Sequence, residues 1–375
     1  MKPNRILFTL ASIVLTIQLL LLEPVFPIVA TASTGTFISA IDKITVAPQK
    51  ITQRSRLASK SASPADSVIF VGDVMLGRNV ENLMRRLGSN YPFLGIDLIQ
   101  NYPQSHVVGN FEASMSETHT ETPAYGMRFS VDDVFLPALR EAHFTHLSLA
   151  NNHSLDNGFL GYENALERLE EHSLTAFGSN DAVNKDSITY LDTSKGIIAL
   201  IGINASQRIP SDKEITEVFA KASRHSSFQV AFIHWGNEYE PKHSSTQRLL
   251  AEILVDAGAD LIVGHHPHVV QDVDLVKGVI VFYSLGNYIF DQYFSKEVQE
   301  GLVIGFDLQN DPTITLTPTT SMSSLSQPTA MSATERNKFL NELSLRSHPS
   351  LVNKIKAGSI PLLDTVATST KVAMM

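Results

Sequence analysis

The central part of the chain alternates short apolar runs with amphipathic stretches. The runs are rich in β-branched residues and almost continuously apolar, which is typical of strands buried on both faces of a sheet. They cover residues 67–71, 106–108, 145–150, 197–203, 229–233, 260–263, 279–283 and 302–308. Between them, apolar residues recur with helical spacing over 131–143, 164–172 and 244–257. Strands that alternate with helices in this way predict an α/β layered fold.

The first 32 residues have the pattern of an export segment. Lys2 and Arg5 precede an apolar run over 6–22, and Ala30-Thr31-Ala32 fits a cleavage site for a signal peptidase. The run is slightly longer than a usual signal core and just short of a comfortable membrane span. We therefore expect residues 1–32 to be either a cleaved signal peptide or an N-terminal membrane anchor. Either alternative predicts an exported protein associated with the cell envelope.

Shifts in composition divide the rest of the chain into three segments. Residues 33–65 are rich in Ser, Thr, Lys, Gln and Ala without a strong period, which predicts a flexible linker. Residues 66–320 are predicted to form the folded domain, and 321–375 a Ser/Thr-rich extension. One short helix is predicted in the extension, because Ser332 and Glu335 have the spacing of a capping box.

Charge and cysteine content exclude several classes of function. The 375 residues include 29 Lys and Arg against 38 Asp and Glu, so the net charge is −9. A negative chain without a basic block is a poor match for nucleic acid. There is no G-x-x-x-x-G-K-[ST] loop for a nucleotide, which argues against an ATP-using ligase subunit. Cysteine is absent, so any metal ion must be bound by His, Asp, Glu or Asn.

Polar residues and glycines follow six of the predicted strands directly. In open α/β sheets, ligands bind beyond the carboxyl ends of the strands, and glycine lets the backbone turn sharply there. The clusters lie at residues 72–78, 109–112, 151–158, 234–238, 264–268 and 284–287. Together they deliver Asp, Glu, Asn and His to one edge, which suits a hard or borderline divalent ion.

These clusters resemble, in order and spacing, those of the bacterial capsule-synthesis CapA family. The resemblance covers about 67–308 and rests on Gly72-Asp73 through Arg78, Gly109-Asn110-Phe111-Glu112, Ala150-Asn151-Asn152-His153, His234-Trp235-Gly236-Asn237-Glu238 and Gly264-His265-His266-Pro267-His268. That family contributes to poly-γ-glutamate synthesis or export and is similar to the calcineurin-like metallophosphoesterases. The resemblance therefore implies a four-layer sandwich of two mixed β-sheets flanked by helices, with a metal site at the strand ends.

The resemblance also implies ligands for one or two divalent ions, which we expect to be Mn, Fe or Zn. These ligands are Asp73, Glu112, Asn152, His234, His265 and His268, with His266 as the competitor of His268. Two positions depart from the metallophosphoesterase pattern, because Met75 replaces a histidine and Asn110 replaces the aspartate that bridges two metals. A thioether is a poor ligand for such ions. We expect Glu112 to supply the charge that Asn110 lacks.

Other residues are assigned to catalysis and to substrate. By resemblance, His153 is the histidine that acts as general acid or stabilises developing charge. Arg78, Asn110 and Glu238 are predicted to bind substrate, because Arg suits carboxylate and phosphate groups and the other two flank the predicted metal ligands. Each has a structural alternative, such as an ion-paired Arg78 or a His153 that braces its loop.

Two further polar or aromatic residues are assigned structural roles. Asp156 is predicted to be a turn or capping residue, and Trp235 to be part of the core. The histidines that lead the fourth and fifth clusters, His234 and His265, could also be satisfied polar residues at strand ends.

Three functional hypotheses follow. The first is an exported component of poly-γ-glutamate production that handles the anionic polymer or its precursor, with membrane synthase subunits as partners. The second is a metal-dependent phosphoesterase or amide hydrolase, and the third is a non-catalytic polymer-binding scaffold. Met75 and Asn110 favour the first and third over the second, because both weaken a two-metal hydrolytic site.

Overall fold

The computed structural model of the chain describes residues 64–309 and 312–362. The predicted signal or anchor over 1–32 lies outside these residues, as does nearly all of the predicted linker. Within the described ranges, no helix is long and apolar enough to span a bilayer.

The first of two sheets has nine strands, in the order β14-β13-β12-β1-β2-β3-β4 with β11 beside β1 and β15 beside β13. Its strands are β1 (Ser67–Val74), β2 (Ser105–Phe111), β3 (His146–Ser148), β4 (Thr175–Phe177), β11 (Asn287–Ile289), β12 (Glu300–Asp307), β13 (Thr313–Thr320), β14 (Thr329–Ala330) and β15 (Ser359–Pro361). β1 runs parallel to β2 and β11 but antiparallel to β12, so the sheet is mixed. The register sets Asp73 opposite Asn110 on one side and Asn287 on the other.

The second sheet has six strands, in the order β5-β6-β7-β8-β10-β9. Its strands are β5 (Ile188–Thr193), β6 (Gly196–Asn204), β7 (Phe228–His234), β8 (Leu261–His265), β9 (Val273–Val276) and β10 (Val279–Phe282). The central strands are parallel, and the edge strands β5 and β9 are antiparallel to their neighbours. The register places His234 opposite His265 at the carboxyl ends of β7 and β8.

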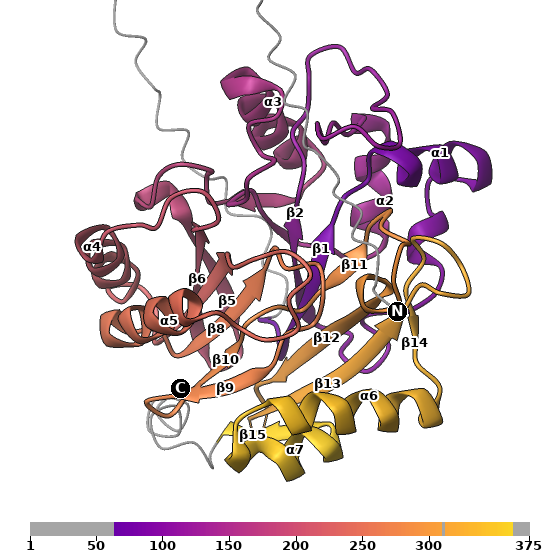
Figure 1. Cartoon of the computed structure of the whole chain (residues 1–375). Helices are drawn as coiled ribbons and strands as arrows, with labels where there is room; N and C mark the ends of the chain where they lie inside the picture. The colour runs from indigo at the N-terminus through magenta and orange to yellow at the C-terminus, as the bar shows by residue number, and fades with distance from the viewer. Residues whose placement is uncertain (1–63, 310–311, 363–375) are drawn as a thin grey trace, which may run out of the picture. The chain divides into compact units, whose positions relative to one another are not determined.

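The helices that precede β8 in the chain cover the outer faces of the two sheets (Figure 1). The α-helices are α1 (Arg78–Leu87), α2 (Leu136–Glu141), α3 (Gly158–Glu171), α4 (Asp212–Ala222), α5 (Ser245–Ala257), α6 (Ala333–Arg346) and α7 (Val352–Ala357). The 3-10 helices are η1 (Tyr91–Phe93), η2 (Asp133–Phe135), η3 (Lys185–Ser187), η4 (Glu297–Gln299) and η5 (Pro349–Leu351). The apolar faces of α1, α2 and α3 pack on the nine-stranded sheet, and those of α4 and α5 on the six-stranded sheet. This arrangement confirms the predicted α/β sandwich of two mixed sheets flanked by helices.

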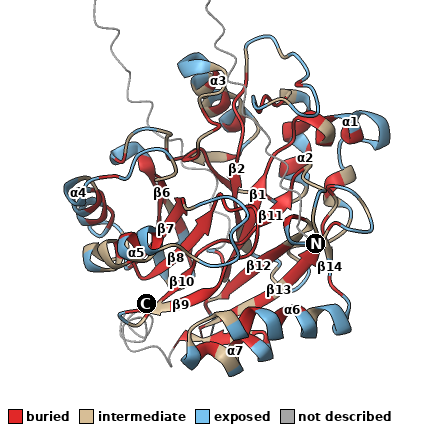
Figure 2. Ribbon diagram, viewed as in Figure 1, coloured by how far each residue is buried: buried red, intermediate tan, exposed pale blue. Residues whose placement is uncertain are grey.

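Alternation along β1 and β7 shows how the layers form. Val68 and Phe70 of β1 face the six-stranded sheet, and the Phe70 and Phe232 rings lie 6.2 Å apart between the sheets. Ile69 and Val71 point the other way, into the core beneath the helices. Since both faces of these strands are covered, their side chains are buried throughout (Figure 2). This explains the almost continuous apolar runs in the sequence.

The predicted helix near the C-terminus is α6, and its Ser332–Glu335 capping box is present. The structure adds β14, α7 and β15, which the sequence did not predict. Both of these strands pair with β13, and Phe339 and Leu340 of α6 belong to the same core cluster as Phe70. The described part of the segment after residue 320 is thus packed on the nine-stranded sheet.

Candidate metal centre at the strand ends

The nine-stranded sheet contributes carboxylates and amides. Asp73 ends β1, Asn110 lies near the end of β2 and Glu112 follows it, and all three are almost fully buried. The Asn110 amide Nδ2 donates to Asp73 Oδ1 at 2.8 Å and lies 3.4 Å from Glu112 Oε2. Glycine is required at position 72, because a Cβ there would lie 1.9 Å from the carbonyl oxygen of Gly286.

The six-stranded sheet contributes imidazoles. His265 ends β8, and His266 and His268 lie in the loop that follows it. His265 Nδ1 lies 3.3 Å from Asp73 Oδ1, and His268 Nδ1 lies 3.3 Å from Asp73 Oδ2. Gly264 allows this approach, because a Cβ there would lie 2.1 Å from the carbonyl oxygen of Tyr283. The two sheets thus meet at Asp73.

Two groups of side chains have the spacing needed to hold a metal ion. One ligand atom from each of Asp73, Glu112 and His268 lies within 4.8 Å of the other two. The same holds for Glu238, His266 and His268, so His268 belongs to both groups. We call these the inner and the outer group, since Asp73 and Glu112 are buried whereas Glu238 is exposed.

The inner group fits a bound cation. Asp73 Oδ2, Glu112 Oε1 and both ring nitrogens of His265 are buried without a hydrogen bond, and so is His266 Nδ1 in the outer group. Buried polar atoms without partners are costly, and they gather here around one place. Their oxygen and nitrogen donors, without any thiolate, suit Mn, Fe or Zn.

The pKa shifts of the buried groups also favour a bound cation at the inner group. Burial alone would raise the pKa of Asp73, but the imidazoles of His265 and His268 outweigh it and hold that pKa well below its ordinary value. Burial raises the pKa of Glu112 well above its ordinary value. For His268, burial is outweighed by Glu112 and Asp73, which raise its pKa to about 9. The buried carboxylates thus hold a positive charge next to them, which is the environment a cation requires.

The pKa values of His234 and His266 are lowered, whereas that of His268 is raised. Burial lowers the pKa of His234 well below its ordinary value and that of His266 to about 4, helped by neighbouring histidines. Neutral imidazoles are the form that binds metal ions. His234 Nε2 donates to Asn152 Oδ1 at 2.7 Å, and Asn110 Nδ2 donates to His234 Nδ1 at 3.2 Å. The predicted ligands His234 and Asn152 therefore touch each other at the edge of the inner group.

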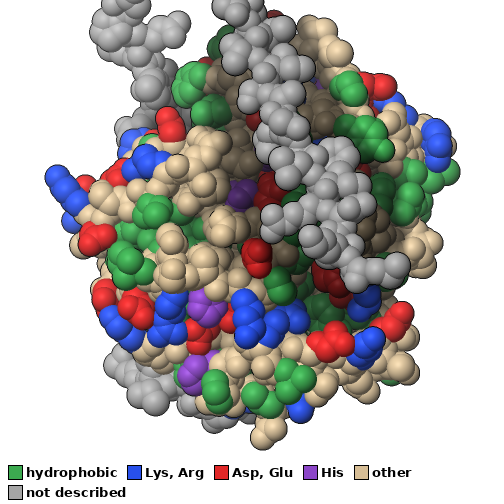
Figure 3. Space-filling view, in the orientation of Figure 1, with side chains coloured by type: hydrophobic (Ala, Val, Ile, Leu, Met, Phe, Trp, Pro, Cys, Tyr) green, Lys and Arg blue, Asp and Glu red, His purple; other side chains and the backbone are tan. Residues whose placement is uncertain are grey.

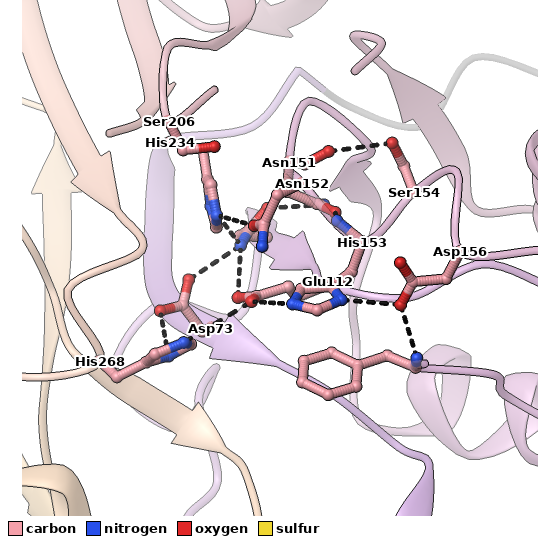
Figure 4. A network of polar contacts seen from close by, with 12 residues as sticks. Asp73, Glu112, Asn151, Asn152, His153, Ser154, Asp156, Ser206, His234 and His268 are labelled. Carbon is pink, nitrogen blue, oxygen red and sulfur yellow. Dashed lines mark hydrogen bonds and ion pairs between the residues drawn. The ribbon is translucent and has the colours of Figure 1, made fainter. Parts of the chain in front are cut away.

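His153 faces the inner group from the turn after β3 (Figure 4). Its Nε2 lies 3.8 Å from Glu112 Oε1, and its Nδ1 lies 2.7 Å from Asp156 Oδ2. Asn151 fixes this turn, because its Oδ1 accepts from the His153 backbone N–H and its Nδ2 donates to Asn110 Oδ1.

The predicted substrate residues differ in their placement. Asn110 lies inside the cluster, and Glu238 lies at its exposed side. The guanidinium of Arg78 forms an ion pair with the buried carboxylate of Asp291 and donates to the Gly126 carbonyl. The structural alternative for Arg78, an ion-paired side chain, is therefore what the structure contains.

Some of the strained backbone of the described residues lies at the site. His266, His268 and Arg78 have φ angles of 96°, 58° and 51°, a region that non-glycine residues seldom occupy. Each such residue costs roughly 1–3 kcal/mol and tends to occur where function demands it. The loop carrying two of the imidazoles is held in this conformation around Pro267.

Some residues at the centre had no predicted role, a structural one, or only a competing one, although their motifs were recognised. Asn151 and Asp156 orient the turn that carries His153, and Asn287 Oδ1 lies 3.0 Å from His268 Nδ1. His266 enters the outer group. Trp235 is core, as predicted, and its Nε1 donates to the Tyr283 carbonyl.

Met75 is also packed in the core rather than turned to the metal centre. It is fully buried in the cluster beneath α1 and α2, and its sulfur accepts a hydrogen bond from the Gly77 N–H. Where the metallophosphoesterase pattern has a histidine, this chain therefore has a well-packed apolar residue.

A third acidic group lies at α1 and is already neutralised. Glu81, His119 and Asp132 have ligand spacing, but Arg85 contacts both Glu81 and Asp132 at 2.5 and 2.6 Å. His119 Nε2 lies 2.9 Å from Glu81 Oε1. The arginine occupies the position of a cation, so this group fastens the loop between β2 and η2 to α1.

Charged side chains gather on the face shown in Figure 3. A His side chain and acidic side chains lie close together in a hollow, and the band below it mixes Lys and Arg with acidic and His side chains. Within the centre, Glu238 is the exposed member of the outer group.

The site and fold define a class before any comparison is made: an α/β sandwich with a carboxylate, amide and imidazole centre at the strand ends. The family described as "Bacterial capsule synthesis protein PGA_cap" matches residues 67–292, and the chain belongs to this family. The predicted recognition is thus confirmed.

Curated relatives carry related descriptions. The chain is 32% identical over 253 residues to the "PGA biosynthesis protein CapA" of Bacillus subtilis (strain 168), covering 63% of this chain and 66% of that protein. It is 33% identical over 260 residues to the "Capsule biosynthesis protein CapA" of Bacillus anthracis, covering 63% and 62%. The chain therefore spans just under two thirds of the length of each.

Among solved structures, a purple acid phosphatase from yellow lupin seeds is similar with a TM-score of 0.32 and 8% identity. That similarity covers 60% of this chain and 53% of the phosphatase. No functional argument rests on a likeness of this size.

Proposed function

We propose that this protein takes part in the production of an anionic capsule-type polymer, poly-γ-glutamate, and that its strand-end centre binds a divalent ion. Membership of the capsule-synthesis family supports the first part, together with the descriptions of the two Bacillus relatives. The inner group carries the second part, because Asp73 and Glu112 bury unpartnered ligand atoms there and His265 does so beside Asp73.

Asp73, Glu112 and His268 would hold the ion, with His265 beside Asp73. A bound Mn, Fe or Zn lowers the pKa of its water or polarises a carbonyl or phosphoryl oxygen. The chain's own part is to supply negative charge through the two carboxylates and to orient them through Asn110. A second ion would use the outer group, so the proposal covers one or two ions per chain.

Hydrolysis of a phosphoester or an amide bond is a second candidate function. It is favoured by His153, whose Nε2 faces Glu112 Oε1 across 3.8 Å and is placed to hold or pass a proton beside the centre. Activity towards a broad panel of such substrates, with metal supplied, tests it. Complete inactivity under those conditions contradicts it.

The setting of the protein in the cell belongs to the same proposal. We infer export to the cell envelope, by a cleaved signal or an anchor, from the pattern of residues 1–32. An anionic polymer or its precursor would be the ligand, and membrane synthase subunits the partners.

The test combines metal content with polymer yield. The full chain, its His265→Ala variant and a His172→Ala control are purified without chelator and analysed for Mn, Fe and Zn. The same genes are returned to a strain that lacks the protein, and surface polymer is measured. We expect metal and polymer in the wild type and control, and the loss of both in His265→Ala.

Other outcomes separate the alternatives. Unchanged polymer after deletion of the gene contradicts the role in polymer production. Normal polymer from a folded, metal-free His265→Ala variant favours the non-catalytic scaffold. Absence of metal from the wild type even after reconstitution contradicts the metal centre.

A further inference from the structure

We propose that Asp156 and Phe129 are positioning residues for His153, fixing its tautomer and ring plane so that unprotonated Nε2 faces the metal centre. The functional value of this arrangement rests on the proposed function of the centre. The arrangement itself is a property of three side chains and can be tested without any ion.

The hydrogen bond to Asp156 determines the tautomer. His153 Nδ1 lies 2.7 Å from Asp156 Oδ2, and an ionised carboxylate can only accept. Nδ1 therefore carries a proton and donates a hydrogen bond to Asp156. In the neutral ring this leaves Nε2 without a proton, directed at Glu112 Oε1. The same pairing of a carboxylate with the far nitrogen orients histidines that bind metals.

Stacking determines the ring plane. The rings of His153 and Phe129 have centroids 3.6 Å apart and are inclined by 16°. A ring held face to face cannot rotate about its χ2 bond without leaving the stack. Asp156 joins the two residues, because its Oδ2 also accepts from the Phe129 backbone N–H at 2.6 Å. One carboxylate oxygen thus fixes both members of the stack.

The Phe129 ring also contacts the guanidinium of Arg78. The guanidinium carbon of Arg78 lies 4.4 Å from the centroid of the Phe129 ring. Since the stacked imidazole covers one face, the guanidinium lies over the other, where a cation is attracted. Arg78 is anchored by its ion pair with Asp291. This contact gives a positioning role to a buried arginine that is ion-paired with Asp291.

A purely structural role for Asp156 would not require a hydrogen bond to the His153 ring. A turn residue has only to satisfy a nearby backbone N–H, which water or another acceptor can do. Asp156 instead places a carboxylate oxygen on an imidazole that is itself directed at the buried carboxyl group of Glu112. His153 is only 8% exposed, so solvent cannot supply an equivalent partner for Nδ1.

The direct test is the nitrogen-15 spectrum of His153 in the full chain, stripped of metal and held at a pH where the ring is neutral. Histidine is labelled selectively, and the His153 signals are assigned with a His153→Gln variant. We expect the wild type to show a protonated Nδ1 and an unprotonated Nε2. A wild-type spectrum with protonated Nε2 overturns the proposal.

Two substitutions of Asp156 sharpen the test. Both donors use the same oxygen, so Asp156→Asn can keep both hydrogen bonds with its single carbonyl oxygen and should retain the wild-type tautomer. Asp156→Ala removes the acceptor, and the Nε2 signal should move towards the protonated form. An Asp156→Ala spectrum identical to that of the wild type also overturns the proposal.

Controls cover unfolding and the aromatic partner. Asp97→Ala removes another aspartate that accepts from a backbone N–H, that of Ile99, and should leave the His153 signals unchanged. Phe129→Leu keeps the Asp156 bond, so the tautomer should persist while the ring-current shift of the His153 ring protons is lost. If Phe129→Leu leaves those proton shifts unchanged, Phe129 is not the stacking partner.

A cellular arm separates this inference from the proposed function. Surface polymer is measured in strains that carry His153→Gln, Asp156→Asn or Asp156→Ala. Loss of polymer in His153→Gln and Asp156→Ala, with rescue by Asp156→Asn, supports both. Normal polymer in His153→Gln contradicts a role of His153 in the proposed function, while the spectra alone decide whether Asp156 positions it.

Discussion

The nine-stranded and six-stranded sheets bring different chemistry to the same place. The first supplies the buried carboxyl groups of Asp73 and Glu112 and amides such as Asn110. The second supplies His265 and His268 on and after β8. Neither half is balanced alone, because buried carboxylates need positive charge and buried imidazoles need acceptors.

This difference shows that the centre belongs to the interface between the sheets. The distances of 3.3 Å from Asp73 to His265 and His268 exist only when the sheets are packed together. The apolar layer between the sheets, including Phe70 and Phe232, therefore holds the centre as well as the fold. The predictions below separate the contributions of the two halves to ion binding.

The largest effect is expected from the acidic half. Asp73→Asn keeps the size of the side chain but removes the charge that both His265 and His268 face. We expect the affinity for Mn²⁺ to fall by at least about 100-fold, more than for residues that only orient ligands. Isothermal titration calorimetry measures it, with Asp97→Asn as the control. A loss of less than about tenfold would show that the imidazole half suffices.

A graded effect is expected within the imidazole half. His268 belongs to both the inner and the outer group, whereas His266 belongs only to the outer one. His268→Ala should therefore reduce Mn²⁺ affinity roughly 10-fold to 100-fold more than His266→Ala. The same titration compares them at one pH. Equal losses would mean that the inner group is not the tighter site.

The charge of the imidazole half should make ion binding depend on pH. The pKa of His268 is raised to about 9, so below that pH its ring carries a proton that an ion must displace. Affinity should rise from neutral pH towards about 9, by up to about tenfold per pH unit for one proton, and then level off. Proton release is measured by calorimetry in buffers of different ionisation enthalpy. No release at neutral pH would contradict a protonated His268.

The smallest effect on ion binding is expected from adding an imidazole to the acidic half. Met75 packs in the core, so Met75→His should not increase Mn²⁺ affinity. It should instead lower the free energy of unfolding by about 1–3 kcal/mol, the cost of a buried polar group without partners. Urea unfolding measures this, with Met75→Leu as the packing control. Tighter Mn²⁺ binding in Met75→His would show that position 75 can reach the centre.

The fold could be predicted where strands are long and buried on both faces. The eight apolar runs each overlap a strand, from β1 to β12, because such strands leave a continuous apolar record in the sequence. Strands β4 and β11 have three residues each and carry no period. β11 exists because its backbone pairs in parallel with β1, which no local pattern reveals.

The site could be predicted as a set of positions but not as a set of contacts. Each predicted ligand follows a strand, and parallel strands end at one edge, so the structure brings them together. Asp156 resembled an ordinary turn residue, because its bond to His153 also depends on where Phe129 lies. For Arg78 the sequence left an anion clamp and an ion pair both open, because its partner Asp291 is distant in the chain.

The sequence by itself determined the layered α/β class, the chemistry available and the family. Apolar periodicity indicates which segments are buried, and the absence of cysteine restricts the metal ligands to oxygen and nitrogen atoms. The order of the motifs, which indicates the family, can be read directly from the sequence. Only the tertiary structure decided which of those donors face one another. It placed His268 between Asp73 and Glu112, and it turned Met75 into the core. These outcomes depend on two sheets that meet across an apolar layer. They could not be predicted, because contacts between residues far apart in the chain leave no periodic pattern in the sequence.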